Sequence, residues 1–111
     1  MKHITDRQLD AIITETQRTG GSTFEGFEVV HHSTGYQVAT TNNTTGLTDR
    51  EAIRAAIEST GGNGGTWMSP AGKLFIDKSI HVTGVNRALE LGRFFHQQEI
   101  WDHAHMAGIK C

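Results

Sequence analysis

Apolar residues recur at intervals of three and four in three stretches of the chain, the spacing that places side chains on one face of a helix. We therefore expect three amphipathic helices, starting near residues 5, 48 and 86. The three apolar stripes consist of Leu9, Ile12, Ile13 and Thr16; of Ile53, Ala56 and Ile57; and of Ala88, Leu91, Gly92 and Phe95.

The first residues of each stretch are typical of helix N-termini. Thr5 with Gln8 three residues later, and Thr48 with Glu51, have the spacing of a capping box. In the third stretch Asn86 takes the cap position. Glycine pairs follow the first two stretches and are expected to end those helices.

Between the expected helices lie runs rich in β-branched and aromatic residues. Residues 23–41 contain two such runs around "STG", and residues 65–82 contain two around "SPAG". Glycine in each middle segment suits the positive φ that a hairpin turn needs. We predict two β-hairpins, and one last strand within "EIWDHAHM" from Glu99.

The predicted order is αββ-αββ-αβ, within a single α+β domain covering residues 1–111. Its units are about 4–46 and 47–84, with a closing αβ unit at about 85–106. The expected sheet is mainly antiparallel, with four or five strands, and the helices pack on one of its faces. The helix starts recur at about 40 residues, which suggests duplication of an αββ unit, but independent selection of good caps explains it equally.

Composition narrows the classes of function. The formal charge is −2 and the ten Lys and Arg residues are scattered, so nucleic-acid binding is not expected. No apolar run approaches the roughly 18 residues of a membrane span, and no secretory signal begins the chain. The only cysteine, Cys111, cannot form an internal disulfide. These features favour the cytoplasm and no membrane.

Seven histidines raise the question of a metal site or an enzyme. His103 and His105 would share one face of the last strand, and Asp77, His81 and Asp102 could complete a small metal-dependent or ligand-binding site. Two ligands on one strand recur by chance, and the chain has neither a phosphate-binding loop nor a nucleophile elbow. We therefore expect no catalytic residue, no metal and no cofactor, and keep these five residues as the alternative.

Protein binding is the leading hypothesis, since interfaces draw their energy from a few aromatic and arginine side chains. Trp67 and Trp101 are the best candidate anchors among the aromatic residues, and Arg93 is the third candidate.

The second half of the chain resembles small uncharacterised proteins of bacteriophages and of actinobacterial genomes. The resemblance covers residues 65–102, and "STGYQV" from Ser33 adds to it. The family continues past the motif into a glycine turn, whereas this chain ends in "HAHMAGIKC". The matching residues are Gly65, Thr66 and Trp67; Asp77, Ser79 and Val82; the run "ALELGR" from Ala88; Gln98; and Ile100, Trp101 and Asp102.

The resemblance implies a phage protein acting in the host cell cytoplasm, and it implies no reaction. Small phage proteins of this kind block host defence complexes, anti-CRISPR activity included, or capture a host protein. The expected partner is accordingly a host or phage protein, with a homo-oligomer left open. Association by genome context carries no physical argument about the site.

Overall fold

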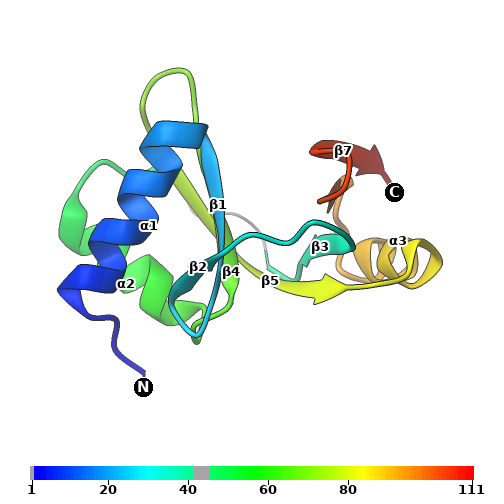
Figure 1. The fold of residues 1–111 in the computed structure, drawn as a ribbon, viewed down its shortest axis with the longest axis horizontal. Coiled ribbons are helices and arrows are strands. Elements are labelled where there is room, and N and C mark those ends of the chain that lie inside the picture. The colour runs from blue at the N-terminus through cyan, green and yellow to red at the C-terminus, as the bar shows by residue number, and fades with distance from the viewer. Residues whose placement is uncertain (1, 42–45) are drawn as a thin grey trace.

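The computed structural model describes residues 2–41 and 46–111. Within them the chain forms the helices α1 (Asp6–Thr19), α2 (Arg50–Ser59) and α3 (Val85–Phe94) and one seven-stranded antiparallel sheet (Figure 1). The α+β class is confirmed, but the expected four or five strands were too few. The strands are β1 Gly21–Glu25, β2 Glu28–Val30, β3 Tyr36–Ala39, β4 Gly64–Met68, β5 Leu74–Val82, β6 Glu99–Asp102 and β7 Ala107–Lys110, in the order β2-β1-β4-β5-β3-β6-β7.

The prediction of a hairpin around "STG" was wrong. The hairpin in this part of the chain instead joins β1 to β2 through Gly26 and Phe27, which both have a positive φ. Strand β3 does not pair with β2 but with β5 and β6. Phenylalanine rarely adopts a positive φ. Here the ring of Phe27 is buried in a hydrophobic core, which holds the backbone in that conformation. The segment around "STG" is therefore a crossover between distant strands.

The end of the chain forms a further strand, β7, that was not predicted. The predicted last strand ends at Asp102, and a turn over residues 103–106 leads into β7, which pairs with β6. His103 and His105 therefore lie in that turn and do not share a strand face. The third helix is followed by a hairpin like the first two, so the closing unit is αββ and extends beyond residue 106.

Two of the three predicted helix caps need correction. Thr5 and Gln8 form the predicted capping box at α1. The cap of α2 is Asp49, whose carboxylate accepts a hydrogen bond from the backbone N–H of Ala52, so Thr48 lies one residue too early. Gly84 rather than Asn86 precedes α3, without a side-chain cap.

The apolar side chains form two separate cores, each in a lobe of its own. The first lobe holds α1, α2, β1, β2, β4 and the first half of β5. Its buried core consists of Ile4, Leu9, Ile12, Phe24, Phe27, Ile53, Ile57, Leu74 and Ile76. The second lobe holds α3, β3, β6, β7 and the second half of β5, around Val38, Ala88 and Ile100.

Gly92 lets α3 approach β6 closely. A Cβ built on Gly92 would lie 2.9 Å from Cγ2 of Ile100 and 2.6 Å from Sγ of Cys111. Gly92, part of the apolar stripe predicted for the third helix, therefore lies at the contact between α3 and β6. Cys111 packs against the second core, and its backbone N–H donates a hydrogen bond to the carbonyl of Gln98.

Both cores lie on the same face of the sheet. Alternate residues of a strand share a face. Along β5, Leu74 and Ile76 belong to the first core and Val82 packs against the second, so all three are on one side. The alternate residues Phe75, Asp77, Ser79 and His81 face the opposite side, which none of the helices among the described residues covers. Figure 1 shows β5 running from one lobe into the other.

The candidate functional site: a cleft between the lobes

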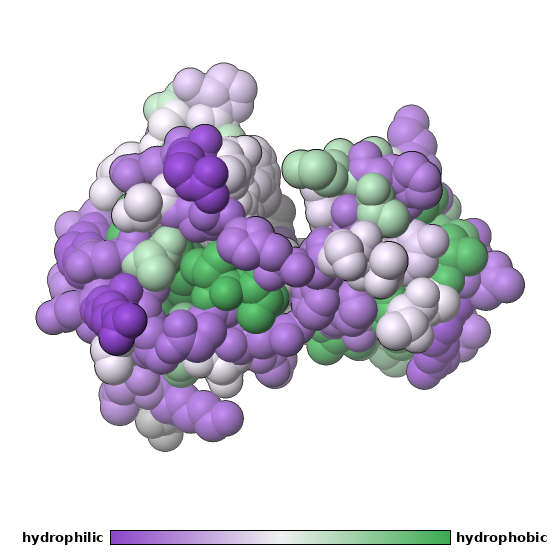
Figure 2. All heavy atoms as spheres, viewed as in Figure 1, coloured by the Kyte–Doolittle hydropathy of each residue, from purple (hydrophilic) through white to green (hydrophobic). Residues whose placement is uncertain are grey.

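The uncovered face of the sheet forms a cleft of about 1260 Å³ between the two lobes. Its residues come from both lobes, and Figure 2 shows the notch that separates them. Because β5 is the strand shared by both lobes, the middle of β5 lies at the floor of this cleft.

A row of polar residues crosses the floor from strand to strand. Asp77 on β5 pairs with Gly65 on β4, and Oδ1 of Asp77 lies 3.5 Å from the position that a Cβ of Gly65 would occupy. Ser79, two residues further along β5, is buried and accepts a hydrogen bond of 2.9 Å from Nε2 of Gln37 on β3. Gln37 in turn pairs with Trp101 on β6.

Asp77 is the most strongly perturbed acid of the cleft. Burial raises the pKa of its carboxyl from 3.8 to about 7, because the charged form loses its hydration. Gly65 opposite contributes no side chain, so the carboxyl lines the cleft rather than being covered from the neighbouring strand. Near neutral pH this acid is therefore present in both protonation states.

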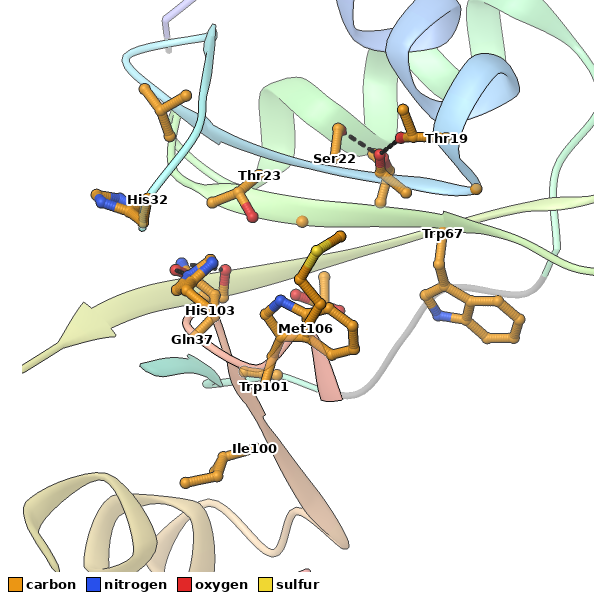
Figure 3. Close-up of a pocket in the computed structure, with 18 of the residues that line it drawn as sticks. Thr19, Ser22, Thr23, His32, Gln37, Trp67, Ile100, Trp101, His103 and Met106 are labelled. Carbon is orange, nitrogen blue, oxygen red and sulfur yellow. Dashed lines mark hydrogen bonds between the residues drawn. The ribbon is translucent and has the colours of Figure 1, made fainter. Parts of the chain in front are cut away.

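Two tryptophans stand at the sides of this row. Trp67 on β4 is 40% exposed and stacks on Phe75, with ring centroids 4.2 Å apart. Trp101 on β6 is 42% exposed. Figure 3 shows Trp67 extending from β4 toward the side of the strand on which Trp101 and Met106 lie. Two of the three predicted partner-binding residues thus line one cleft, while Arg93 is exposed on α3 and is not among the lining residues.

Histidines gather at one end of the cleft. Nε2 of His103 donates a hydrogen bond of 3.0 Å to Oε1 of Gln37. The rings of His32 and His81 stack with centroids 3.8 Å apart, and both lie within 5.5 Å of the ring of His103. Burial lowers the pKa of His103, and the neighbouring His32 and His81 lower it further. The neutral form of His103 is therefore favoured at this end of the cleft.

The five residues of the alternative hypothesis are divided between two places. Asp77 and His103 line the cleft, and His81 stacks beside it. His105 instead donates from Nδ1 to Oδ2 of Asp102 at 2.7 Å, and this bond is the main reason that the pKa of Asp102 is lowered. No group of three or more His, Cys, Asp or Glu side chains within residues 2–41 and 46–111 is placed to hold a metal ion.

The rim of the cleft carries charges that are already paired. Glu15 of α1 accepts hydrogen bonds from His31 and from Arg18. Both bonds lower the pKa of Glu15, and the bond from His31 has the larger effect. Arg18 is the only lysine or arginine among the described residues that line the cleft. Glu99 lines the cleft from β6 on the other lobe.

Sequence reasoning did not anticipate the floor of the cleft. Gln37 was given no role, and Gly65 and Ser79 were named among the residues that carry the resemblance. Alternation places Asp77 and Ser79 on one face of their strand, but the partner strand β3 was assigned to a different hairpin. Without that pairing, Gln37 and Trp101 could not be joined to them.

Comparison of the chain with models of known protein families, with curated proteins and with solved structures found no match. The resemblance to phage proteins therefore stays a prediction. No helix among the described residues combines the length and apolar character required to cross a membrane.

Proposed function

We propose that this protein is a non-enzymatic binding protein that acts by protein–protein interaction and holds a segment of its partner in the cleft. The observation that carries this proposal is the position of Trp67 and Trp101, which come from different lobes and line the same cleft. Half-exposed tryptophans over a concave surface are the side chains that most often supply the binding energy of an interface.

The size of the cleft fits a peptide segment. Pockets for small molecules usually measure about 300–1,000 Å³, whereas this cleft measures about 1260 Å³ and is open between the lobes. Met106, 78% exposed in the turn beside Trp101, adds a flexible apolar side chain of a kind that adapts to different partners.

The nature of the partner rests on the resemblance alone. We propose a host or phage protein, with a component of a host defence system, in the manner of anti-CRISPR proteins, as the leading candidate. The cytoplasmic setting belongs to the same proposal.

A cross-linking experiment tests the role of the cleft. A photoreactive benzoylphenylalanine replaces Met106 in one variant and the exposed Phe94, which lies on α3 outside the cleft, in another. After irradiation in a lysate of the native cell, the probe at Met106 should yield a discrete protein adduct that Trp101→Ala abolishes. The probe at Phe94 should yield none. Equal adducts from both positions, or an adduct unaffected by Trp101→Ala, would contradict the proposal.

A small ligand-binding enzyme is the second candidate, favoured by one observation. The pKa of Asp77, about 7, suits a general acid or base at neutral pH. Only His103 of the other four residues in that hypothesis lines the cleft with Asp77. An Asp77→Asn variant that still forms the Met106 adduct but loses a measured turnover would favour the enzyme.

A further inference from the structure

We propose that the histidine cluster, His32, His81 and His103, is a pH-sensitive switch that holds the crossover between β2 and β3 against the second lobe near neutral pH and releases it on acidification. The crossover consists of residues 31–35 and joins the two lobes. Its residues 31–33 line one end of the cleft. The switch goes beyond the proposed function, and only its effect on partner capture rests on that function.

The three rings of the cluster come from separate parts of the chain. His32 belongs to the crossover, His81 to β5 and His103 to the turn after β6. The rings of His32 and His81 stack at an interplanar angle of 15°. The centroid of the His103 ring lies 5.1 Å from that of His32 and 5.5 Å from that of His81. In Figure 3, His32 and His103 lie at the end of the cleft away from Trp67.

Two hydrogen bonds attach the backbone of the crossover to the second lobe beside these rings. Nε2 of His81 donates to the carbonyl of Thr34 at 2.9 Å, and the backbone N–H of His103 donates to the carbonyl of Gly35 at 3.0 Å. Gly35 has a positive φ of 84°, and a Cβ built on it would lie 2.7 Å from Cε1 of His81. The crossover therefore lies directly on the His81 ring, and a change at that ring acts on the crossover.

The hydrogen bonds of the cluster define where its protons are. Each Nε2 faces an oxygen that can only accept a hydrogen bond. These oxygens are the carboxylate of Glu25 for His32, the carbonyl of Thr34 for His81 and the amide oxygen of Gln37 for His103. Each neutral ring therefore carries its proton on Nε2, and acidification adds the second proton at Nδ1. Protonation retains these hydrogen bonds but gives neighbouring rings charges of the same sign.

Charge repulsion is the physical basis of the switch. The three side chains are half-buried, and like charges at such separations repel where water screens them only in part. Burial lowers the pKa of His103, and the neighbouring His32 and His81 lower it further. Glu25 and Asp102 act in the opposite direction without reversing the shift. Because the pKa of His103 is below its ordinary value, the closed arrangement loses stability as the pH falls through that value.

Other titratable groups lie on the elements packed against the cluster. They are Glu25 of β1, Glu28 of β2, His31 beside His32, Tyr36 of β3, Asp77 of β5, and Asp102 and His105 at the turn. Glu25 is bonded to one ring and balances one charge. Asp102 is bonded to His105. Burial raises the pKa of Asp77 to about 7, so this acid becomes neutral on acidification and does not balance a further charge.

Release of the crossover changes one end of the cleft. Residues 31–33 form part of the cleft wall because the crossover is held on the second lobe by the bonds to Thr34 and Gly35. When repulsion within the cluster breaks those bonds, this part of the wall moves away. A partner segment held against it loses contacts, so we expect weaker capture at acidic pH.

The test is amide hydrogen exchange of the full chain, followed by NMR between about pH 5 and pH 8, the range in which histidine gains its charge. Exchange rates are corrected for the intrinsic effect of pH. The amide of His103 reports on the switch, because it donates to Gly35. Its protection should be lost on acidification. The amides of Met68 in the first lobe and Gln97 in the second, both bonded to backbone carbonyls, should stay protected.

Variants separate the cluster from the other histidines. His81→Gln combined with His103→Gln retains side-chain N–H donors but removes two of the three charges, so protection at position 103 should no longer depend on pH. His3→Gln combined with His31→Gln is the matched control. It removes two surface histidines that each pair with a glutamate, and it should respond to pH like the parent.

Glu25→Gln tests the balance of charge from the other side. It removes the carboxylate bonded to His32, so the loss of protection should occur at higher pH than in the parent. If the double cluster variant does not fold, this variant decides, and loss of protection at an unchanged or lower pH overturns the inference.

Three other results would also overturn it. One is full protection of the His103 amide at low pH in the parent. Another is a pH-dependent loss of protection that persists in the folded double cluster variant. The third is simultaneous loss at Met68 and Gln97, which would indicate general acid unfolding.

The two proposals fail separately, because exchange is measured on the protein alone. Release of the crossover on acidification together with no adduct at Met106 would retain the switch and reject the protein partner. A Trp101-dependent adduct together with constant protection of the His103 amide would retain the partner and reject the switch.

Discussion

The two lobes differ in how much apolar surface each of them buries. Among the described residues, nine buried apolar residues form the core of the first lobe, from both of its helices, from β1 and β5 and from the segments next to α1 and β1. Three form the core of the second lobe. Burial of apolar surface is the main favourable contribution to folding. The second lobe therefore depends on its attachment to the first through β5, which pairs with β4 in one half and β3 in the other.

This difference teaches how the cleft obtains its shape. The buried side of β5 switches between the lobes. Leu74 and Ile76 are buried on the helix face, whereas Ser79 is buried on the cleft face and Ile80, on the helix face, is 39% exposed. Between the two cores the helix face of β5 carries the exposed Lys78 and Ile80, whereas Ser79 on the opposite face is buried at the floor of the cleft. The cleft floor is thus built where neither core extends.

The largest expected effect is loss of the first core. Phe24→Ala should cost about 3–5 kcal/mol and unfold both lobes together, because the second core is too small to persist alone. Ile100→Ala, in the second core, should cost about 2–4 kcal/mol and loosen the second lobe first. Urea melts of variants retaining either Trp67 or Trp101, with the other changed to Phe, report on each lobe. Coincident transitions in the Ile100→Ala background would show that the lobes unfold as one unit.

A second effect, of opposite sign, is expected at the junction. Asp77 has a folded pKa of about 7, above the unfolded value, so the folded state is most stable below about pH 4 and loses stability as pH rises toward 7. Asp77→Asn removes this loss. The variant should exceed the parent in stability by up to about 4 kcal/mol at pH 8 and show little difference at pH 4. Denaturant melts at the two pH values measure the gap, and a variant less stable at pH 8 would mean that the carboxylate is stabilised by its surroundings.

A smaller effect distinguishes the packing of α3 in the second lobe. Gly92→Leu should destabilise by roughly 1–3 kcal/mol through overpacking, since even a Cβ would lie within 2.9 Å of Ile100 and closer still to Cys111. Gly84→Ala is the control for a glycine without steric neighbours, because nothing lies within 4 Å of its added Cβ and its cost is limited to the weaker N-cap preference of alanine. Thermal melts followed through Trp101 should show the larger loss in Gly92→Leu. A higher melting temperature for Gly92→Leu would refute the close approach.

The smallest effect concerns the cap of α2 in the first lobe. Asp49→Ala should cost about 1 kcal/mol, the usual value of a lost N-cap, because it removes the hydrogen bond to Ala52. Thr48→Ala should change the midpoint by no more than replicate melts differ. If Thr48→Ala were the more destabilising of the two variants, Thr48 would be the cap, as first predicted from the sequence.

The accuracy of the sequence-based predictions followed the range of the interactions involved. The capping box of Thr5 and Gln8 and the hairpin joining β4 to β5 were predicted, because each depends on residues close in the chain. The cap of α2 was missed by one residue, since Thr48 and Asp49 are both good caps. The hairpin around "STG" was wrong because local turn signals do not reveal that β3 pairs with β5, some 40 residues away.

The sequence by itself determined the α+β class, the three helices and the apolar faces that they bury, because periodicity and capping act within one or two turns of the chain. It also identified Trp67 and Trp101 as candidate anchors from their residue type. Only the tertiary structure decided that these tryptophans share a cleft with Asp77, and that the chain has two cores. The physical reason is that the cleft arises from strand pairing across the lobes. That pairing depends on which surfaces are buried together rather than on any local pattern.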